Sequence, residues 1–291
     1  MVISAISGGL GNQLFQYAAG RALAERLNAP LKLEKEWYRY SKDRKFQLEL
    51  FNIQATVITS EREEDYLAHL KRASIGVLMR AGRRLRIPGT ILPLLDRRQG
   101  FDERFLTVDG DVYLSGNWQT ERYFKSIADK IRQELTFKSK PDSENRAMLD
   151  QIAGTEAVML HVRRGDYVKN AETNVYHGVC GLDYYQKAVV LTQERVSNPH
   201  FFIFSDDPEW TAANLKLDRP STYVTHNTGR HDEEDLRLMM HCRHFIVANS
   251  SFSWWGAWLS ANPSKQVIGP KRWFATSEIS SDLAPLEWTV I

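Results

Sequence analysis

The chain has 291 residues, which at about 150 residues per domain indicates two domains rather than one hydrophobic core. With 43% hydrophobic and 25% charged residues it has the composition of a folded globular protein, which excludes the fibrous and disordered classes. The formal net charge is +2, and two cysteines, Cys180 and Cys242, are too few for a disulfide framework or a tetrahedral zinc site. No apolar run approaches the ~20 residues that cross a bilayer, and the first residues lack the pattern of a secretory leader, so we expect an intracellular, cytoplasmic protein.

Residues 71–98 depart from this balance, because they hold eight basic side chains and a single acid, Asp96, for a local charge of +7. Apolar residues are interleaved with the arginines, a composition that suits an anionic membrane surface. A solvated helix beside the acidic run at residues 61–65 explains the pattern equally well, and nucleic acid is a weaker match. Two interpretations therefore stay open, a solvated helix and peripheral contact with an anionic inner membrane, and we expect no nucleic-acid partner.

The first half of the chain opens with a strand, a glycine loop, a helix and a second strand, which we expect at residues 2–6, 7–12, 13–27 and 30–34. A strand–helix–strand unit of this kind favours a parallel sheet. Further along, the pattern predicts helices within residues 66–85, a strand at residues 111–116 and a helix at residues 121–135.

A polar stretch with one proline, residues 138–145, is the best linker candidate, and we expect one domain at residues 1–140 and another at residues 141–291. Beyond it strands alternate with helices: strands at 157–162, 201–205, 244–248 and 266–269, and helices at 183–196, 233–241 and 254–260. This alternation predicts an α/β fold with a doubly wound parallel sheet, whose ligands lie beyond the carboxyl ends of the strands.

Polar clusters stand where these strands should end, at residues 7–13, 161–167, 205–207 and 249–253. Together they offer guanidinium groups, carboxylates, hydroxyls and amides, which suits a phosphorylated ligand rich in hydroxyl groups. Arg163 and Arg164 are the most informative, because a guanidinium fork matches phosphate geometry and Gly165 allows the chain to turn so that both arginines reach one site. The alternative is a surface ion pair between one of these arginines and Asp166.

The glycine loop is a weaker signal, since Leu14 stands where a dinucleotide fingerprint has its third glycine. Asn12 and Gln13 could hydrogen-bond a sugar or phosphate at this helix start. A plain turn with Asn12 as the helix cap explains the loop equally well.

In residues 249–258 we interpret the serines as part of a site and Trp254 and Trp258 as packing, because the tryptophans share one helix face. Asp235 lies in an acidic helix start, where it either complements the helix dipole or binds a guanine edge.

A metal site is not expected. Asp109-Gly110-Asp111, the one Asp-x-Asp in the sequence, has the pattern of a turn before a strand. Asp206 and Asp207 could bind one ion, but adjacent carboxylates on a strand end diverge. Because two arginines can neutralise a diphosphate, we expect neither a metal nor another cofactor.

Five motifs in this order, GGLGNQLFQYAAGRALA, GNWQTERYF, HVRRGDYV, FFIFSDD and FIVANSSFSWWGAWLS, resemble the bacterial α-1,2-fucosyltransferases with their His-x-Arg-Arg-x-Asp signature. The resemblance runs from Ile6 to about Phe274. It implies a GT-B-like fold, with two Rossmann-like domains facing a cleft, an acceptor-side domain first and a GDP-fucose-binding domain second. It implies inverting, metal-independent transfer of L-fucose from GDP-β-L-fucose to the 2-hydroxyl of a terminal galactose, the activity of a galactoside 2-α-L-fucosyltransferase.

By this resemblance Arg163 and Arg164 hold the phosphates, with Arg163 nearest the leaving oxygen. His161 and Asp166 complete the motif, Asp166 either as general base or as a carboxylate that orients an arginine. The resemblance further implies a donor-binding set, made up of Gly11, Asn12, Ser205, Asp235, Ser250, Ser251 and Phe252.

Two other functions remain open from the sequence. One is phosphate-ester hydrolysis, with His161 as a phosphohistidine nucleophile and the arginines as a clamp. The other is non-catalytic glycan binding through the eight tryptophans, which leaves the arginine pair unexplained. The sequence leaves the galactoside acceptor open.

Overall fold

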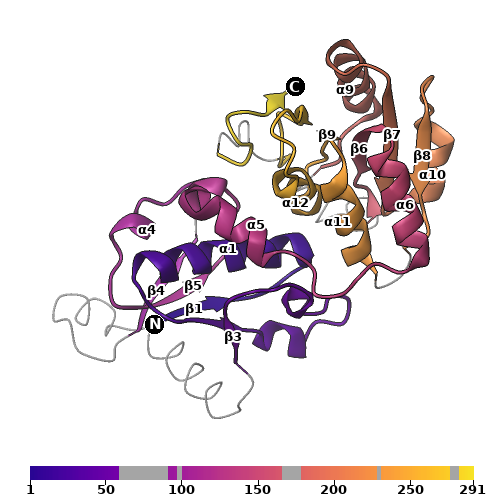
Figure 1. The fold of residues 1–291 in the computed structure, drawn as a ribbon. Helices are drawn as coiled ribbons and strands as arrows, with labels where there is room; N and C mark the ends of the chain where they lie inside the picture. Colours follow the sequence, from indigo (N-terminus) through magenta and orange to yellow (C-terminus); the bar gives the residue numbers. More distant parts are fainter. Residues whose placement is uncertain (59–90, 97–99, 166–177, 228–230, 276–281) are drawn as a thin grey trace. The chain divides into compact units, whose positions relative to one another are not determined.

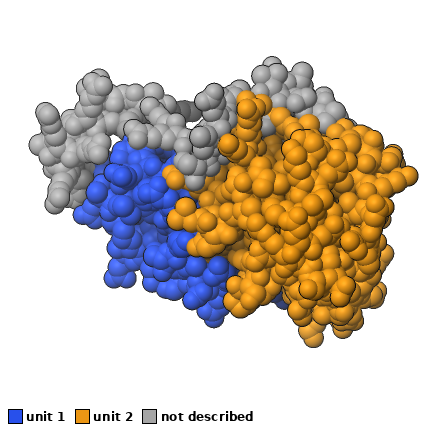
Figure 2. All heavy atoms as spheres, turned by 90° about the horizontal axis from the view of Figure 1, so that it is seen from above, with its two compact units in different colours: residues 1–138 blue, residues 139–291 orange. Residues whose placement is uncertain are grey.

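The fold was determined as a computed structural model, which describes residues 1–58, 91–96, 100–165, 178–227, 231–275 and 282–291 (Figure 1). The chain divides into two compact units, Met1–Lys138 and Ser139–Ile291, which Figure 2 shows in separate colours. The division falls inside the expected linker, two residues before the expected boundary at Lys140.

Unit 1 is built on a five-stranded sheet in the order β3-β2-β1-β5-β4, with every pairing parallel. Its strands are β1 (Val2–Ala5), β2 (Leu31–Glu34), β3 (Thr56–Val57), β4 (Ile91–Leu95) and β5 (Asp111–Ser115). The long helix α1 (Leu10–Arg26) packs on β1 and β2, as expected for a strand–helix–strand start. A Cβ on Gly20 would lie 3.0 Å from the Ser4 side chain, so glycine permits this close packing.

The other helices in the described part of unit 1 are short: η1 (Glu36–Arg39), η2 (Leu48–Leu50), α4 (Arg104–Thr107), η3 (Glu121–Tyr123), η4 (Lys125–Ile127) and α5 (Ala128–Glu134). The prediction of one helix over residues 121–135 is therefore wrong. The backbone leaves helical geometry at Phe124 (φ −133°) and Ile127 (φ −122°). Phe124 is fully buried against Phe15, so tertiary packing overrides the local helical pattern there.

Unit 2 contains a six-stranded parallel sheet in the order β11-β10-β9-β6-β7-β8. Its strands are β6 (Glu156–Val162), β7 (Pro199–Ser205), β8 (Ser221–Val224), β9 (His244–Ile246), β10 (Val267–Gly269) and β11 (Thr289–Val290). Counted from β6 as the first strand, the order is 3-2-1-4-5-6, that of a doubly wound Rossmann sheet. The predicted sheet is confirmed, and its switch point lies between β6 and β9.

Among the described residues of unit 2, five helices cover this sheet: α6 (Ser143–Ala153), α9 (Leu182–Arg195), α10 (Pro208–Asn214), α11 (Asp232–His241) and α12 (Ser251–Leu259). Val158, Leu160 and Val162 pack in one cluster with α9. The alternate residues of β6, including His161, point to the other face, where α6, α11 and α12 pack side by side (Figure 1). Trp254, Trp255 and Trp258 are buried in α12, which confirms their role in packing.

Two features of unit 2 differ from the sequence-based expectation. Helix α6 begins at Ser143, inside the expected linker, because the Asp142 carboxylate accepts a hydrogen bond from the Asn145 N–H (2.8 Å) as a helix cap. Helix α10 and strand β8 were not expected, because both elements are short and the segment that forms them, residues 208–224, is rich in polar residues.

The basic segment lies largely outside the described residues. Only residues 91–96 of it are described, and they form β4 and its end. The helices expected within residues 66–85 also lie outside. None of the helices in the described part of the chain is long and apolar enough to span a membrane.

Candidate functional site

The predicted arginine pair directly follows the central strand of unit 2. The β6 and β7 strands are in register from Glu156–Pro199 to Val162–Ser205, so the residues after each strand emerge side by side. The Arg163 Nη1 atom lies 2.9 Å from Asp206 Oδ2, and Arg164 Nε lies 3.4 Å from Asp207 Oδ2. The described part of the first cluster, residues 161–165, therefore meets residues 205–207 at one edge of the sheet, as the sequence predicts.

Asp206 holds the turn that presents the arginines. Its Oδ1 atom accepts hydrogen bonds from the backbone N–H groups of Arg164 (2.8 Å) and Gly165 (3.0 Å). A Cβ on Gly165 would stand 2.4 Å from Asp206 Oδ2, so only glycine lets the chain approach this carboxylate. Burial opposes ionisation of Asp206, but the Arg163 guanidinium and the two backbone donors hold its pKa below the usual value. Asp206 is therefore a carboxylate at neutral pH.

Arg164 is held by two contacts, an ion pair with Asp207 and a cation–π contact with Trp210 on α10. Its guanidinium carbon lies 3.5 Å from the centre of the Trp210 ring. The side chains of Arg163 and Arg164 are only 19% and 17% exposed. A guanidinium carries five N–H donors, so an arginine fixed by one carboxylate can also bind a phosphate. The arrangement is a pre-oriented pair of cations at the sheet edge where ligands of doubly wound folds bind.

His161 is buried in the same region, with 4% of its surface exposed. Its ring centre lies 6.1 Å from that of Phe252, and its Nδ1 atom has no hydrogen-bond partner among the described residues. Burial lowers the pKa of His161 to about 4, with Arg163 adding to the shift and Asp206 opposing it. His161 is thus a neutral imidazole at physiological pH.

The predicted loop after β9 lies next to β6. Ser250 is buried and is the N-cap residue of α12, while Ser251 and Phe252 are half-buried in its first turn. Neighbouring Asn249 donates hydrogen bonds to the carbonyl groups of Gly178 (3.3 Å) and Trp273 (3.4 Å), and so fixes the loop. The start of α12 thus brings serine hydroxyls and helix N-terminal N–H groups to the switch point.

Asp235 lies in the first turn of α11, which packs against α12. Its Oδ1 atom accepts a hydrogen bond from the Asn227 amide (2.9 Å), and Asn227 is bonded in turn to Asn145 (2.9 Å). Burial raises the pKa of Asp235 to about 7; the Asn227 hydrogen bond opposes this shift, and the neighbouring carboxylates add to it. A helix start that only complemented the dipole would be solvated, so this carboxyl group is a candidate ligand contact.

Ser205, at the end of β7, is bonded to the Asp207 N–H (3.0 Å) and the Thr211 hydroxyl (2.9 Å). These contacts help to start α10. Asp166, the proposed base, lies outside the described residues.

In unit 1 the glycine loop has a different geometry from the one expected. Gly9 is the N-cap residue of α1, so the interpretation of Asn12 as the cap is wrong. Asn12 lies in the first turn, and its Oδ1 atom accepts a hydrogen bond from Gln119 Nε2 (2.9 Å). Gly11 is buried in the same turn.

The prediction that Gln13 contacts a ligand is also wrong. Its side chain is fully buried and is bonded to backbone groups of Gly8 (3.3 Å), Lys45 (2.9 Å) and Gln47 (2.8 Å). Gln13 therefore fastens the loop to the body of unit 1.

The interpretation of Asp109-Gly110-Asp111 as a turn is confirmed, because it bends into the amino end of β5, at Asp111, away from the edge where ligands bind. Among the described residues, no group of three or more His, Cys, Asp or Glu side chains has metal-binding geometry. Cys180 and Cys242 are free cysteines.

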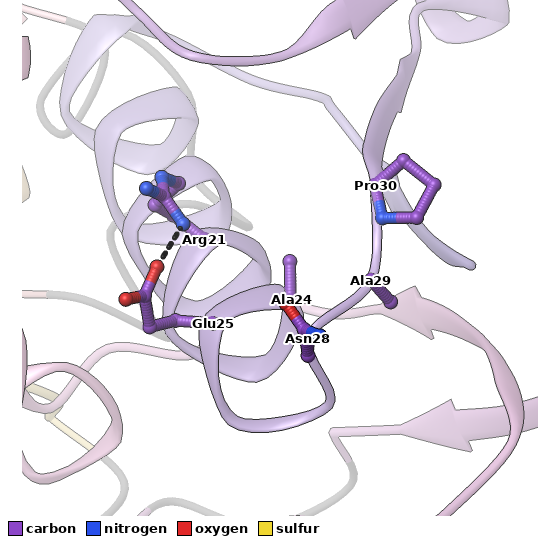
Figure 3. A pocket seen from close by; sticks show the side chains of 6 residues that line it. All are labelled: Arg21, Ala24, Glu25, Asn28, Ala29 and Pro30. Carbon is purple, nitrogen blue, oxygen red and sulfur yellow. Dashed lines mark hydrogen bonds and ion pairs between the residues drawn. The ribbon is translucent and has the colours of Figure 1, made fainter.

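A hollow of about 310 Å³ lies at the C-terminal end of α1, lined by Arg21, Ala24, Glu25, Asn28, Ala29 and Pro30 (Figure 3). Arg21 and Glu25 are paired there (2.8 Å). It stands at the opposite end of α1 from Asn12, so it is not part of the candidate site.

Each of the two units is an α/β unit built on a parallel sheet, and this is the fold class of the GT-B glycosyltransferases. The model of glycosyl transferase family 11 matches residues 99–291, and the chain belongs to this family. The chain is 34% identical to an α-1,2-colitosyltransferase of Escherichia coli, over 100% of this chain and 99% of that protein. It is 30% identical to the O-antigen biosynthesis glycosyltransferase WbnK of Escherichia coli, over 94% of each. Mouse galactoside 2-α-L-fucosyltransferase Sec1 is 27% identical, over 88% of this chain and 63% of that protein.

The solved structures agree on the fold. NodZ is a fucosyltransferase from Bradyrhizobium. The crystal structure of NodZ soaked with GDP-fucose matches this structure with a TM-score of 0.52 at 16% sequence identity, over 89% of this chain and 91% of that chain. The predicted family and fold class are confirmed. Membership in a glycosyltransferase family contradicts the hydrolase and glycan-binding alternatives, and the burial of His161 leaves little access for in-line attack on a phosphate.

Proposed function

We propose that this protein transfers L-fucose from GDP-β-L-fucose to the 2-hydroxyl of a terminal galactose, with inversion and without a metal ion. The observation that supports this function most directly is the arginine pair at the end of β6, which Asp206, Asp207 and Trp210 hold in place in a chain of family 11. An α-1,2-colitosyltransferase and a galactoside 2-α-L-fucosyltransferase among the relatives support the linkage.

In the proposed reaction the acceptor oxygen forms a bond to C1 of fucose while the bond from C1 to the diphosphate breaks. The electron pair leaves with GDP, whose growing negative charge Arg163 and Arg164 neutralise. A metal is unnecessary on this account because the guanidinium groups supply the positive charge. The acceptor proton goes to a base. Asp206 is a poor base because it is held as an arginine-paired carboxylate, and buried His161 is a poor base because of its lowered pKa, so we retain Asp166 as the proposed base.

In the proposed donor site, the nucleoside of GDP-fucose binds to residues around the switch point between β6 and β9. Asp235 binds the guanine edge, and Ser250, Ser251 and Phe252 surround guanine and ribose. Ser205 lies on the phosphate side of this set. In unit 1, Asn12 and Gly11 approach the fucose.

A second donor is favoured by one specific observation, the 34% identity to an α-1,2-colitosyltransferase. Colitose is fucose without the 3-hydroxyl group. A site that hydrogen-bonds a hydroxyl rejects the deoxy analogue strongly, whereas a site built without that contact discriminates little. The test is kcat/KM with GDP-fucose and with GDP-colitose on one acceptor. We expect GDP-fucose to be preferred by at least about tenfold; a preference for GDP-colitose would make colitose the donor sugar.

Donor binding should depend on pH through Asp235. Guanine presents two N–H donors on its edge, which a carboxylate accepts and a protonated acid does not. Because the pKa of Asp235 is raised to about 7, the affinity for GDP-fucose should rise about tenfold between pH 6 and pH 8. GDP-fucose suits a titration by calorimetry, since its diphosphate diester does not titrate in this range. The Asp235→Asn variant should bind more weakly and show a flat profile; a flat profile for the unmodified protein would refute the guanine contact.

The acceptor that we propose is a galactose-terminated glycan of O-antigen assembly, on the basis of the similarity to WbnK. We further propose peripheral contact with an anionic membrane through residues 71–98, on the basis of their charge of +7. The protein should co-sediment with anionic liposomes more than with neutral ones at low salt. Equal sedimentation with both would refute this contact.

A further inference from the structure

Three loops of unit 1 converge at the carboxyl edge of its sheet. The glycine loop follows β1, the turn at residues 116–119 follows β5, and Asp96 follows β4. The buried Gln16 joins the first two, because its Oε1 atom accepts the Ser7 N–H (2.9 Å) and its Nε2 atom donates to the Gly116 carbonyl (3.0 Å). The spacing between the glycine loop and the turn is thus fixed from inside the fold.

The turn itself has an unusual backbone. Trp118 has a φ of +56°, although its side chain is bulky and fully buried. The Trp118 N–H donates to Asp96 Oδ2 (2.8 Å), and its carbonyl accepts the Thr120 N–H (2.9 Å). Rare backbone conformations of this kind persist where the surrounding structure enforces them, and they cluster at functional sites. The next residue along the enforced turn is Gln119.

Gln119 reaches back across 107 residues to the glycine loop, where its Nε2 atom donates to Asn12 Oδ1 (2.9 Å). This hydrogen bond sets the orientation of the Asn12 amide, since the oxygen faces Gln119 and the NH2 group faces the other way. The same side chain packs against Gly8, where a Cβ, at a φ of +77°, would lie 2.9 Å from Asn12 Nδ2, so glycine leaves room for it. The orientation of the Asn12 amide follows from its hydrogen bond with Gln119.

We propose that Gln119 is a positioning residue for fucosyl transfer, which keeps Asn12 oriented as a hydrogen-bond donor towards an oxygen of the reacting sugars. The inference rests on the proposed function, because it assigns Asn12 to the sugars and not to GDP. Gln119 acts through Asn12 and does not itself contact the substrate. Hydroxyl and ring oxygens of a sugar accept hydrogen bonds, so an Asn12 amide turned to present its oxygen could not bind a ring oxygen.

The test is the Gln119→Glu variant, which keeps the side-chain shape but offers only acceptor oxygens. A carboxylate at position 119 attracts the NH2 group of Asn12 and turns the amide over. We expect kcat/KM for transfer to fall about tenfold, with unchanged GDP affinity and thermal melting temperature. The matched control is Gln133→Glu, which adds the same charge at an exposed position of α5 and should stay within about twofold of the unmodified protein.

A double-mutant cycle separates positioning from a merely structural role. In the Asn12→Ala background, which is itself impaired, Gln119→Glu should cause no further loss of kcat/KM. A full additional loss in that background, or unchanged activity of the single Gln119→Glu variant, would overturn the inference. Failure of the proposed function has a different signature, because the unmodified protein would then transfer no fucose at all.

Discussion

Replacing Arg163 by alanine is expected to lower kcat/KM for fucosyl transfer by about 10³-fold, the range found when a cation that stabilises a leaving phosphate is removed. The Arg163→Lys variant keeps the charge but loses the planar fork, so we expect a loss of about 10²-fold. The measurement is GDP release at steady state with a saturating acceptor. Both variants should keep their fold, since Asp206 still accepts the N–H groups of Arg164 and Gly165 that hold the turn after β6.

The control for this experiment is Arg219→Ala, which removes an exposed arginine on the connection between α10 and β8 of the same unit. Its activity should remain within about twofold of the unmodified protein. An Arg163→Ala variant as active as this control would contradict the assignment of the diphosphate to the end of β6.

The second large effect is expected from Asp206→Asn. The change keeps the shape of the side chain but removes the negative charge that pairs with Arg163 and accepts the N–H groups of Arg164 and Gly165. We expect kcat/KM to fall about 10²-fold and the free energy of unfolding to drop by about 2 kcal/mol at neutral pH. The measurements are transfer kinetics and urea unfolding.

The stabilisation by Asp206 should depend on pH in one direction. The folded state lowers the pKa of Asp206, so its contribution to the free energy of unfolding is present at neutral pH and is lost as the pH falls below the usual aspartate value of about 4. The difference between the unmodified protein and Asp206→Asn should therefore shrink in acid. The control Asp218→Asn, at an exposed position, should change neither stability nor activity. An equal difference at pH 3 and pH 7 would show that Asp206 does not act through its charge.

Much of unit 2 was predictable from the sequence, because short apolar strands alternate with amphipathic helices and each strand ends in polar residues. That pattern is local, and from it we correctly predicted that residues 161–165, 205–207 and 249–253 lie at one edge of one sheet. The partners within the site were not predictable. That Asp206 pairs with Arg163 depends on the register between β6 and β7, and the stacking of Trp210 on Arg164 depends on a helix, α10, that the sequence pattern did not predict.

In unit 1 the sequence predicted less, for a different physical reason. The contact of Asn12 with Gln119 joins residues 107 positions apart, and the left-handed backbone falls on Trp118, a residue type that does not favour it. The burial of Phe124 likewise breaks a stretch with good helical periodicity. These features are products of tertiary packing, and the motif GNWQTERYF was the one local signal that residues 116–124 matter.

The most direct test of the account is the linkage and metal dependence of the product. The protein is incubated with GDP-β-L-fucose and a galactose-terminated oligosaccharide in the presence of EDTA, and the product is analysed by NMR. The account predicts turnover in EDTA and a single new α-linked fucose on the 2-hydroxyl of galactose. Transfer to another hydroxyl, a retained β-configuration, or activity that requires an added divalent ion would contradict it.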